Sequence, residues 1–262
     1  MKKQFAFSLV IAAALCVATK LTAGEAATMS GKVGPTVDPV EYEANRGLLT
    51  LQGPSGLFIN PTSATLPAGA FTVQYCFLLP DFSFGDTMAH GALISYGVTD
   101  WLELGANLLF VDQEQGDTLF SAGPLARVRL VKHDGWIPQV SVGGYGKIGD
   151  DPIQFASAFV ALTERIEVKQ GPLESIAIHA GARQTWHDGF DSFRGYAGVD
   201  IQLPWRLYIV GEIATESNEE NFTPWAAGLQ WRAGGINIST AAVTAPETGG
   251  EVGFFFGIGT AF

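Results

Sequence analysis

Cysteine, basic residues and long apolar runs are all scarce in this chain of 262 residues. It has 2 cysteines, and its 15 lysines and arginines stand against 26 acidic residues, which gives a formal net charge of −11. This balance argues against a nucleic-acid-binding protein, which would need a basic patch. After the N-terminal region, no segment offers the run of about 18 apolar residues that a membrane-spanning helix would require. If the protein enters a membrane, it must do so with strands.

The first 24 residues are typical of a cleaved signal peptide. Lys2 and Lys3 precede an apolar run, residues 5–17, and small residues follow it. The run is shorter than the roughly 20 residues of a spanning helix, which favours a secretory leader. Small residues allow cleavage at three places, namely after Ala23, Gly24 or Ala26.

Two consequences follow from removal of this leader. Three lysines and no acids are lost, so Lys+Arg falls from 15 to 12 against 26 acids and the net charge becomes about −14. Cys76 is then the single cysteine, which excludes an internal disulfide. Lipidation at Cys16 is disfavoured because Leu15 occupies a position that requires a small residue.

From residue 69 onward, apolar residues occupy every second position of successive segments. In the last segment Val252, Phe254, Phe256 and Ile258 alternate with mostly small residues before Phe262. A period of two predicts strands with one apolar face. The segment at 154–166 is the least regular, because it carries apolar residues on both faces. We expect twelve strands, near residues 69–79, 88–98, 101–111, 119–131, 137–148, 154–166, 175–185, 192–203, 206–215, 222–232, 235–243 and 251–262.

These strands predict an all-β fold, a closed antiparallel transmembrane β-barrel of about 12 strands, with 10 or 14 as alternatives. Most segments have roughly the 9–11 residues that cross a bilayer at a tilt, and an open sheet would leave unpaired edges in lipid. A soluble barrel or sandwich is the alternative. The tryptophans favour the membrane barrel because they fall near strand ends, as interfacial aromatic belts do: Trp101, Trp136, Trp205 and Trp231 near one end, and Trp186 and Trp225 near the other.

Residues 25–68 differ from the rest, because glycine and proline interrupt them throughout. We expect an N-terminal arm or a plug that enters the barrel, with a short strand as a further alternative. The domain organisation is therefore a leader at 1–24, this segment at 25–68 and the barrel at 69–262.

One rim of the predicted barrel is acidic. An even strand number places both termini on one side, and the resemblance to outer-membrane barrels described below implies that this side is the periplasm. The opposite connections then form an acidic mouth: Asp112, Glu114, Asp117, Asp150, Asp151, Asp188, Asp191, Glu216, Glu219 and Glu220. Such a mouth would concentrate cations within a Debye length of about 8–10 Å, and could share divalent ions with lipopolysaccharide. Acidic loops that only keep a surface soluble are the alternative, and no loop has the spacing of a calcium site.

The inward face of the predicted strands is polar and of mixed charge. Its ionisable residues are candidates for a pore lining: Glu103, Arg127, Arg129, Lys147, His179, Arg183, Arg194, Asp200, Glu212 and Arg232. In membrane barrels such residues set solute selectivity or form internal salt bridges. The alternative is that they pair across a closed interior that conducts nothing.

Enzyme motifs give no support for catalysis. Residues 144–149 match the dinucleotide fingerprint, but they end a predicted strand and no helix follows them to hold a pyrophosphate. No G-x-S-x-G elbow is present, and His179 lies on the inward face. No pair of histidines has metal-ligand spacing. We expect no enzymatic activity, no catalytic residues, no metal and no cofactor.

Two stretches carry a family resemblance. Gly56–Gly69 reads GLFINPTSATLPAG and Tyr96–Gly105 reads YGVTDWLELG. This pattern resembles the G-x-x-x-x-P-T, L-P-x-G and Y-G-x-T-D-x-L-E-x-G run of small Gram-negative outer-membrane barrels, among them transporters of the phenol meta-pathway type and YjbH-like barrels. It covers about fifty residues, together with the C-terminal strand. The resemblance implies a tight periplasmic turn at Thr99-Asp100 and an inward-pointing Glu103.

The resemblance also implies a cellular setting. The expected location is the cell outer membrane, and the expected partners are its lipid, lipopolysaccharide, small solutes and the barrel-assembly machinery, which would engage the strand that ends at Phe262. The predicted function is passive passage of small solutes. A non-conducting structural or envelope-interaction barrel is the alternative.

Overall fold

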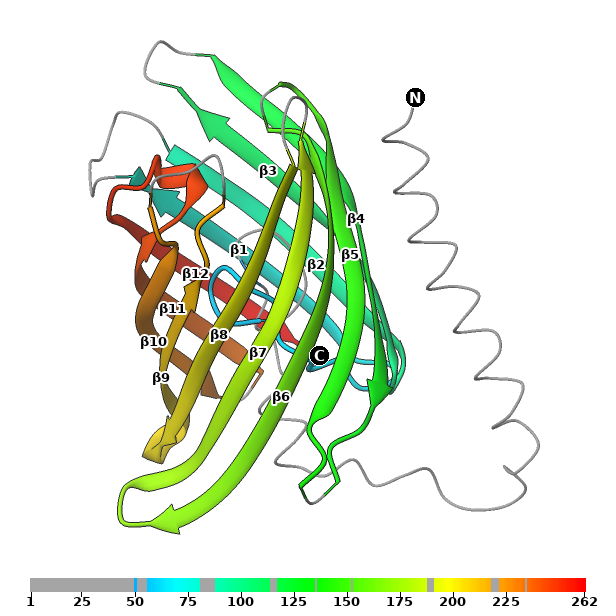
Figure 1. Ribbon diagram of the computed structural model, residues 1–262, viewed down its shortest axis with the longest axis vertical. Coiled ribbons are helices and arrows are strands. Elements are labelled where there is room, and N and C mark those ends of the chain that lie inside the picture. The colour runs from blue at the N-terminus through cyan, green and yellow to red at the C-terminus, as the bar shows by residue number, and fades with distance from the viewer. Residues whose placement is uncertain are drawn as a thin grey trace, which may run out of the picture.

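The computed structural model describes residues 50, 56–80, 88–113, 117–134, 136–151, 153–187, 191–217, 222–233 and 235–262. Within them, twelve antiparallel strands form one closed barrel (Figure 1). The predicted all-β class and the strand number are therefore confirmed. The strands are β1 Phe71–Leu79, β2 Met88–Thr99, β3 Leu102–Asp112, β4 Thr118–Val131, β5 Gln139–Gly149, β6 Phe155–Gln170, β7 Leu173–His187, β8 Asp191–Leu203, β9 Leu207–Ala214, β10 Trp225–Ala233, β11 Ile236–Thr244 and β12 Gly253–Ala261.

The barrel closes by pairing its first strand with its last. Register runs from Thr72 opposite Ala261 to Leu79 opposite Phe254. Beyond this ladder, Phe262 N donates to Phe71 O at 2.8 Å. Closure leaves no strand edge with unpaired main-chain groups, which is the condition that a lipid environment imposes on a sheet.

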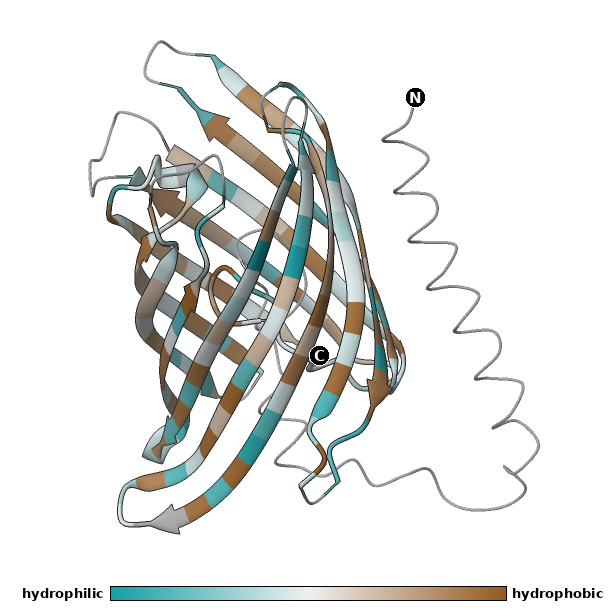
Figure 2. Cartoon of the chain, in the orientation of Figure 1, coloured by the Kyte–Doolittle hydropathy of each residue, from teal (hydrophilic) through white to brown (hydrophobic). Residues whose placement is uncertain are grey.

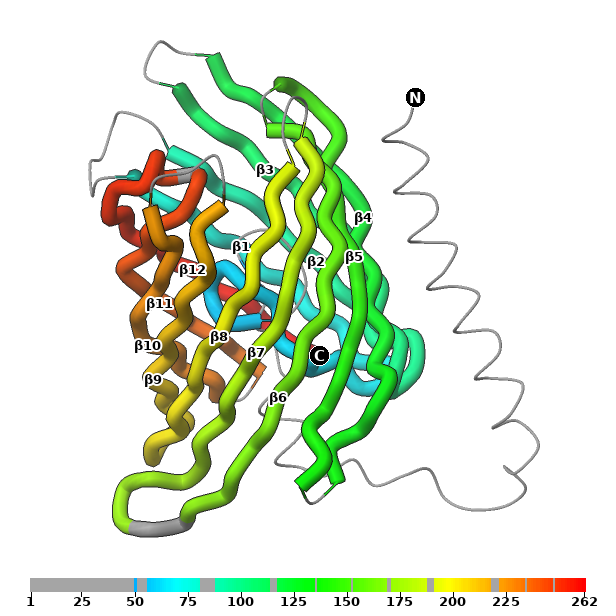
Figure 3. Tube along the Cα trace, viewed as in Figure 1, coloured from blue at the N-terminus to red at the C-terminus, as the bar shows by residue number. Residues whose placement is uncertain are grey.

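Strand lengths are uneven around the barrel. The β6–β7 hairpin contains the two longest strands, of 16 and 15 residues, and it projects beyond its neighbours at the lower end of Figures 1 and 3. Its turn places Gly171 at φ 59°, a left-handed conformation that glycine adopts without steric cost. The predicted segment at 154–166 is therefore confirmed as a strand, but it continues to Gln170.

Large apolar side chains point outward from the strands and remain exposed. Along the strands of Figure 2, apolar and polar residues alternate. The exposed set includes Tyr75, Leu104, Leu108, Ile178, Phe193, Ile213 and Ile258. At the strand ends, Trp136 and Trp205 are 86% and 88% exposed. Among the described residues, no helix is long and apolar enough to span a membrane.

The core of the protein lies inside the barrel. Leu57, Phe58 and Ile59 form one cluster there with side chains of β1–β3 and β9–β12, such as Leu93 and Phe255. In Figure 3 the blue tube of this N-terminal segment runs through the interior of the barrel. The position of this segment explains why inward-facing side chains of the wall are buried rather than solvated.

Candidate functional site: a loop bound in the lumen

Residues 56–69, here called the lumenal loop, lie among the inward-facing side chains of the barrel. The loop begins with a tight turn, in which Leu57 N donates to Asn60 O at 3.0 Å and Gly56 bridges Pro61. A Cβ atom on Gly56 would lie 2.3 Å from Asn60 O, so only glycine fits this turn. Of the alternatives expected for residues 25–68, residues 56–68 lie inside the barrel, and residues 25–49 and 51–55 lie outside the described residues.

The carboxylate of Glu212 on β9 holds the tip of this turn. It accepts hydrogen bonds from Phe58 N at 2.7 Å, Ile59 N at 2.6 Å and Asn60 N at 3.0 Å, and a further one from Asn60 Nδ2 at 2.8 Å. Successive main-chain N–H groups that converge on one anion form a nest. Glu212 thereby satisfies donors that would otherwise be buried without partners.

A buried ion pair between β3 and β4 holds the middle of the loop. Arg127 Nη2 contacts Glu103 Oε2, and neither side chain has any solvent exposure. Glu103 also accepts from Ser95 Oγ at 2.6 Å and from Leu66 N at 3.0 Å. Arg127 Nη1 donates to Thr62 O at 2.9 Å. The loop therefore lies against both members of the pair.

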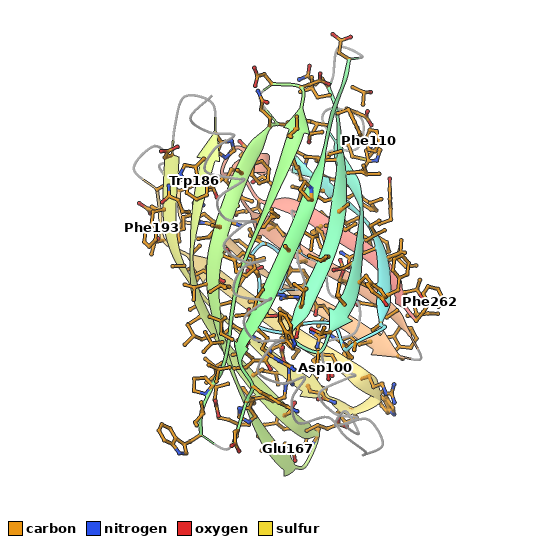
Figure 4. The ribbon with its side chains drawn as sticks, turned by 90° about the vertical axis from the view of Figure 1, so that its right-hand side faces the viewer. Asp100, Phe110, Glu167, Trp186, Phe193 and Phe262 are labelled. Carbon is orange, nitrogen blue, oxygen red and sulfur yellow. The ribbon has the colours of Figure 1, made fainter. Side chains whose placement is uncertain are left out.

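The turn between β2 and β3 holds the end of the loop. Asp100 Oδ1 accepts from Ala68 N at 3.0 Å, and Asp100 O accepts from Thr65 Oγ1 at 3.0 Å. Gly97 lies so close to the loop that a Cβ atom there would be 2.0 Å from Pro67 O. Figure 4 places Asp100 toward the same end of the barrel as Glu167, opposite Phe110 and Trp186.

These contacts join the two sequence stretches that carry the family resemblance. The first stretch forms the lumenal loop, and the second supplies Gly97, Asp100 and Glu103, which contact it. Thr99 Oγ1 accepts from Leu102 N at 3.0 Å and so stabilises the turn itself. The two stretches are therefore one structural unit, and Glu103 points inward as the resemblance implied.

Other wall side chains bind main-chain atoms of the loop. The donors and acceptors come from β5, β6, β7, β8 and β10. The contacts are Gln230 Nε2 to Leu57 O (3.2 Å), Arg183 Nη1 to Ile59 O (3.3 Å), Tyr196 Oη to Pro61 O (2.9 Å), Gln139 Nε2 to Ser63 O (2.6 Å) and Ser63 N to Thr163 Oγ1 (3.2 Å). Tyr196, Gln139 and Thr163 were not among the predicted candidates. Their only sequence signal is a polar residue at an inward-facing position.

A second buried polar cluster supports the loop through Thr163. His179 lies between Thr163 Oγ1, 3.0 Å from its Nδ1, and Asp200 Oδ2, 3.2 Å from its Nε2. A carboxylate only accepts, so in neutral His179 the proton is on Nε2 and Thr163 donates to Nδ1. Arg165 and Arg232 approach Asp200 at 3.4 and 4.0 Å. This cluster orients the Thr163 hydroxyl so that its oxygen accepts from Ser63 N.

All the predicted pore-lining residues except Arg129 are buried, and Arg129 is half-buried. Arg183 and Arg194 stand directly opposite each other on β7 and β8. Lys147 lies over the Phe155 ring, 5.4 Å from its centroid. The structure thus brings Glu103, Arg127, Arg183 and Glu212 together around the loop, with His179 and Asp200 behind Thr163.

Several residues of the predicted acidic mouth stabilise hairpin ends. Asp112 accepts from Thr118 Oγ1 at 2.8 Å, Asp150 from Phe120 N at 2.8 Å, and Glu216 from Thr223 Oγ1 at 2.8 Å. Asp117, Asp151 and Asp191 are exposed. Glu114, Asp188, Glu219 and Glu220 lie outside the described residues. Within the described part of the chain, no group of three or more His, Cys, Asp or Glu side chains could hold a metal ion.

No protein-family model matches the chain, and no curated protein matches it. Among solved structures it is similar to a mutant of Rh. blastica porin, with 12% identity over 66% of this chain and a TM-score of 0.34. The match spans only 55% of that porin. A loop-deletion mutant of OmpT, an outer membrane protein of Vibrio cholerae, is similar with 10% identity over 74% of this chain and 98% of that chain, at a TM-score of 0.33.

Proposed function

We propose that this chain is an outer-membrane barrel whose lumen is closed by its own lumenal loop, and that small solutes pass when the loop moves. The observation that carries the proposal is the combination of an apolar outer face with a polar inner wall that binds one loop through side chains. Within the described residues the loop is not a strand of the barrel ladder, although a main-chain bond joins Gly69 N at its end to Gly97 O of β2 at 2.7 Å.

The outer face supports residence in a membrane. Burial of apolar surface is worth roughly 25 cal/mol per Å², so the large apolar side chains exposed on the strands favour contact with lipid over contact with water. Trp136 and Trp205 lie at turns beyond the strand ends, where tryptophan meets the headgroup layer. In the same proposal, the barrel-assembly machinery engages β12 and the residue after it, Phe262.

The manner in which the loop is held supports a movable closure. Apart from the main-chain bond of Gly69 N to Gly97 O at 2.7 Å, separate hydrogen bonds that involve side chains hold the loop to the wall. Each is worth a net of about 0.5–1.5 kcal/mol, or about 1.5–3 kcal/mol where a charged group takes part. The ladder of the barrel is continuous without them, because β1 pairs with β2 and β12. The loop can therefore leave the lumen without disrupting any pair of strands. The acidic mouth would then favour cations at the entrance.

A non-conducting structural barrel is the second candidate, and one observation favours it. Leu57, Phe58 and Ile59 are each at most 2% exposed and pack in the apolar cluster of the interior. In that case the loop is a permanent core that stabilises the barrel, and the polar wall serves only to bind it.

Planar-bilayer recording distinguishes the two candidates. The refolded full chain is compared with a variant that lacks residues 25–68. We expect brief, infrequent openings of the full chain and steady conductance of the deletion variant. Retention of the barrel in the variant is checked by its heat-dependent shift in electrophoretic mobility. A folded deletion variant without channel events would contradict passage and leave the structural barrel.

A further inference from the structure

Two wall side chains of opposite charge, Glu212 and Arg183, bind the main chain of one loop residue, Ile59. Ile59 N donates to Glu212 Oε1 at 2.6 Å, and Ile59 O accepts from Arg183 Nη1 at 3.3 Å. A carboxylate and a guanidinium thus bind the nitrogen and the carbonyl oxygen of the same residue. Both form stronger, charge-assisted hydrogen bonds with an ammonium and a carboxylate, which are the groups at these two positions in a free α-amino acid.

The surroundings of the Ile59 side chain are apolar. Ile59 is 2% exposed and belongs to the interior cluster that includes Cys76, Leu78 and Phe255. Withdrawal of the loop would leave this apolar surface next to the two charged groups. The chemistry of the vacated space is complementary to a zwitterion with an apolar side chain.

Glu212 adds a specific reason to expect an ammonium. The hydrogen bonds that its carboxylate accepts come from Phe58, Ile59 and Asn60, all of which belong to the loop. The side chain is 6% exposed. A buried carboxylate is costly to leave without compensation, so the space that the loop vacates has to be filled by other donors.

We propose that Glu212, Arg183 and the neighbouring apolar cluster form a subsite for an apolar α-amino acid, which Ile59 occupies in the closed barrel. The inference rests on the proposed function, because a solute reaches the subsite only when the loop withdraws. A free amino acid then competes with a tethered segment whose effective concentration is of the order of millimolar or above. Binding is therefore weak, as passage through a channel requires.

Cys76 provides a native reporter for loop withdrawal. Its side chain faces the lumen, is 1% exposed and lies in the same cluster as Ile59. The full chain in detergent is treated with methyl methanethiosulfonate, and modification is followed by mass spectrometry with C76S as the background control. We expect leucine at twice its dissociation constant for the open barrel to raise the rate roughly threefold, in line with the linkage relation.

Matched ligands test the two charged groups separately. Isoamylamine lacks the carboxylate of leucine, and isocaproate lacks the ammonium. Both are expected to leave the rate unchanged at the same concentration. An equal effect of isoamylamine would overturn the proposal in favour of an apolar cation, and an equal effect of isocaproate would overturn it in favour of an apolar anion.

The deletion variant separates failure of this inference from failure of the proposed function. In the barrel without residues 25–68, leucine should reduce the ion current, and E212Q or R183Q in that background should remove this block. A conducting variant that leucine does not block would overturn the subsite and retain passage. A folded variant that does not conduct contradicts passage itself, and the subsite then falls with it.

Discussion

Glu103 and Arg127 stand directly opposite each other on β3 and β4 and form an ion pair inside the barrel, with no solvent exposure of either side chain. The lumenal loop donates to one member through Leu66 N and accepts from the other at Thr62 O. The pair therefore joins the barrel wall to the loop. Two charges on neighbouring strands thus bind a segment that lies 37 and 65 positions away in the sequence.

Replacement of Arg127 by glutamine should destabilise the barrel strongly. It leaves Glu103 buried without its cation, and breaking a buried pair in this way costs about 3–5 kcal/mol. The measurement is urea unfolding of the refolded protein in detergent. E103Q/R127Q is the control, because loss of both charges should cost less than the sum of the single changes. Additive costs would show that the two charges do not interact.

Replacement of Glu212 by glutamine should loosen the tip of the loop. The three amides of Phe58, Ile59 and Asn60 lose a charged acceptor, and a loss of about 1.4 kcal/mol corresponds to tenfold faster exchange. Hydrogen exchange read by mass spectrometry on peptides that cover these residues checks the expectation. E216Q is the matched control, since Glu216 is exposed and accepts from Thr223 in an outer connection. Unchanged exchange in E212Q would mean that Glu212 does not hold the loop.

Replacement of Gly97 by alanine should displace the loop without removing a polar contact. The added Cβ would lie 2.0 Å from Pro67 O and 2.8 Å from Leu66 O, both of which are main-chain atoms. We expect faster modification of Cys76 and a loss of stability of about 1–3 kcal/mol from overpacking. G211A is the control, because nothing lies within 4 Å of a Cβ atom at Gly211. Equal behaviour of the two variants would contradict the close approach of the loop to β2.

The turn between β8 and β9 contains two residues with a strained backbone conformation. Trp205 and Arg206 both have positive φ, at 61° and 62°, which is costly for side chains with a Cβ atom. An Asn-Gly turn adopts this conformation readily, so W205N/R206G should stabilise the barrel in detergent by about 1–2 kcal/mol. Urea unfolding measures this change.

The same variant tests the place of Trp205 in lipid. In brominated phospholipid vesicles, quenching of tryptophan fluorescence should fall relative to the native chain, because the headgroup layer has lost an exposed indole. W136N is the companion variant at Trp136, which is 86% exposed. Equal quenching in the native and variant chains would contradict an interfacial position of Trp205.

Regular alternation of apolar residues made the strands predictable. The segment at 154–166, which alternates least regularly, shows where this prediction becomes less reliable. Each predicted segment overlaps an observed strand, because one apolar outer face imposes a period of two on the sequence. The segment at 154–166 has apolar residues on both faces. In the structure Phe159 is buried within a cluster with Leu125 and Tyr145. An inward apolar residue obscures the period wherever the interior is packed.

Local sequence patterns could not predict which wall residues contact the loop. Glu212 binds Phe58 across 154 positions of the chain, and Gln230 binds Leu57 across 173. Because these partners act on main-chain atoms, the loop residues need no particular side chain for most of the contacts. The sequence of the loop therefore carries little information about which wall residues hold it.

The sequence by itself determined the inward and outward faces of the strands, because one apolar face imposes a two-residue period. It predicted a closed ring of about 12 strands and left 10 or 14 as alternatives. Only the tertiary structure decided what fills the lumen of the barrel. Inward-facing charges suit a water-filled passage as well as a bound segment, because either can satisfy them. The hydrogen bonds of Glu212, Glu103, Arg127 and Arg183 to the lumenal loop decide between the two for the closed barrel.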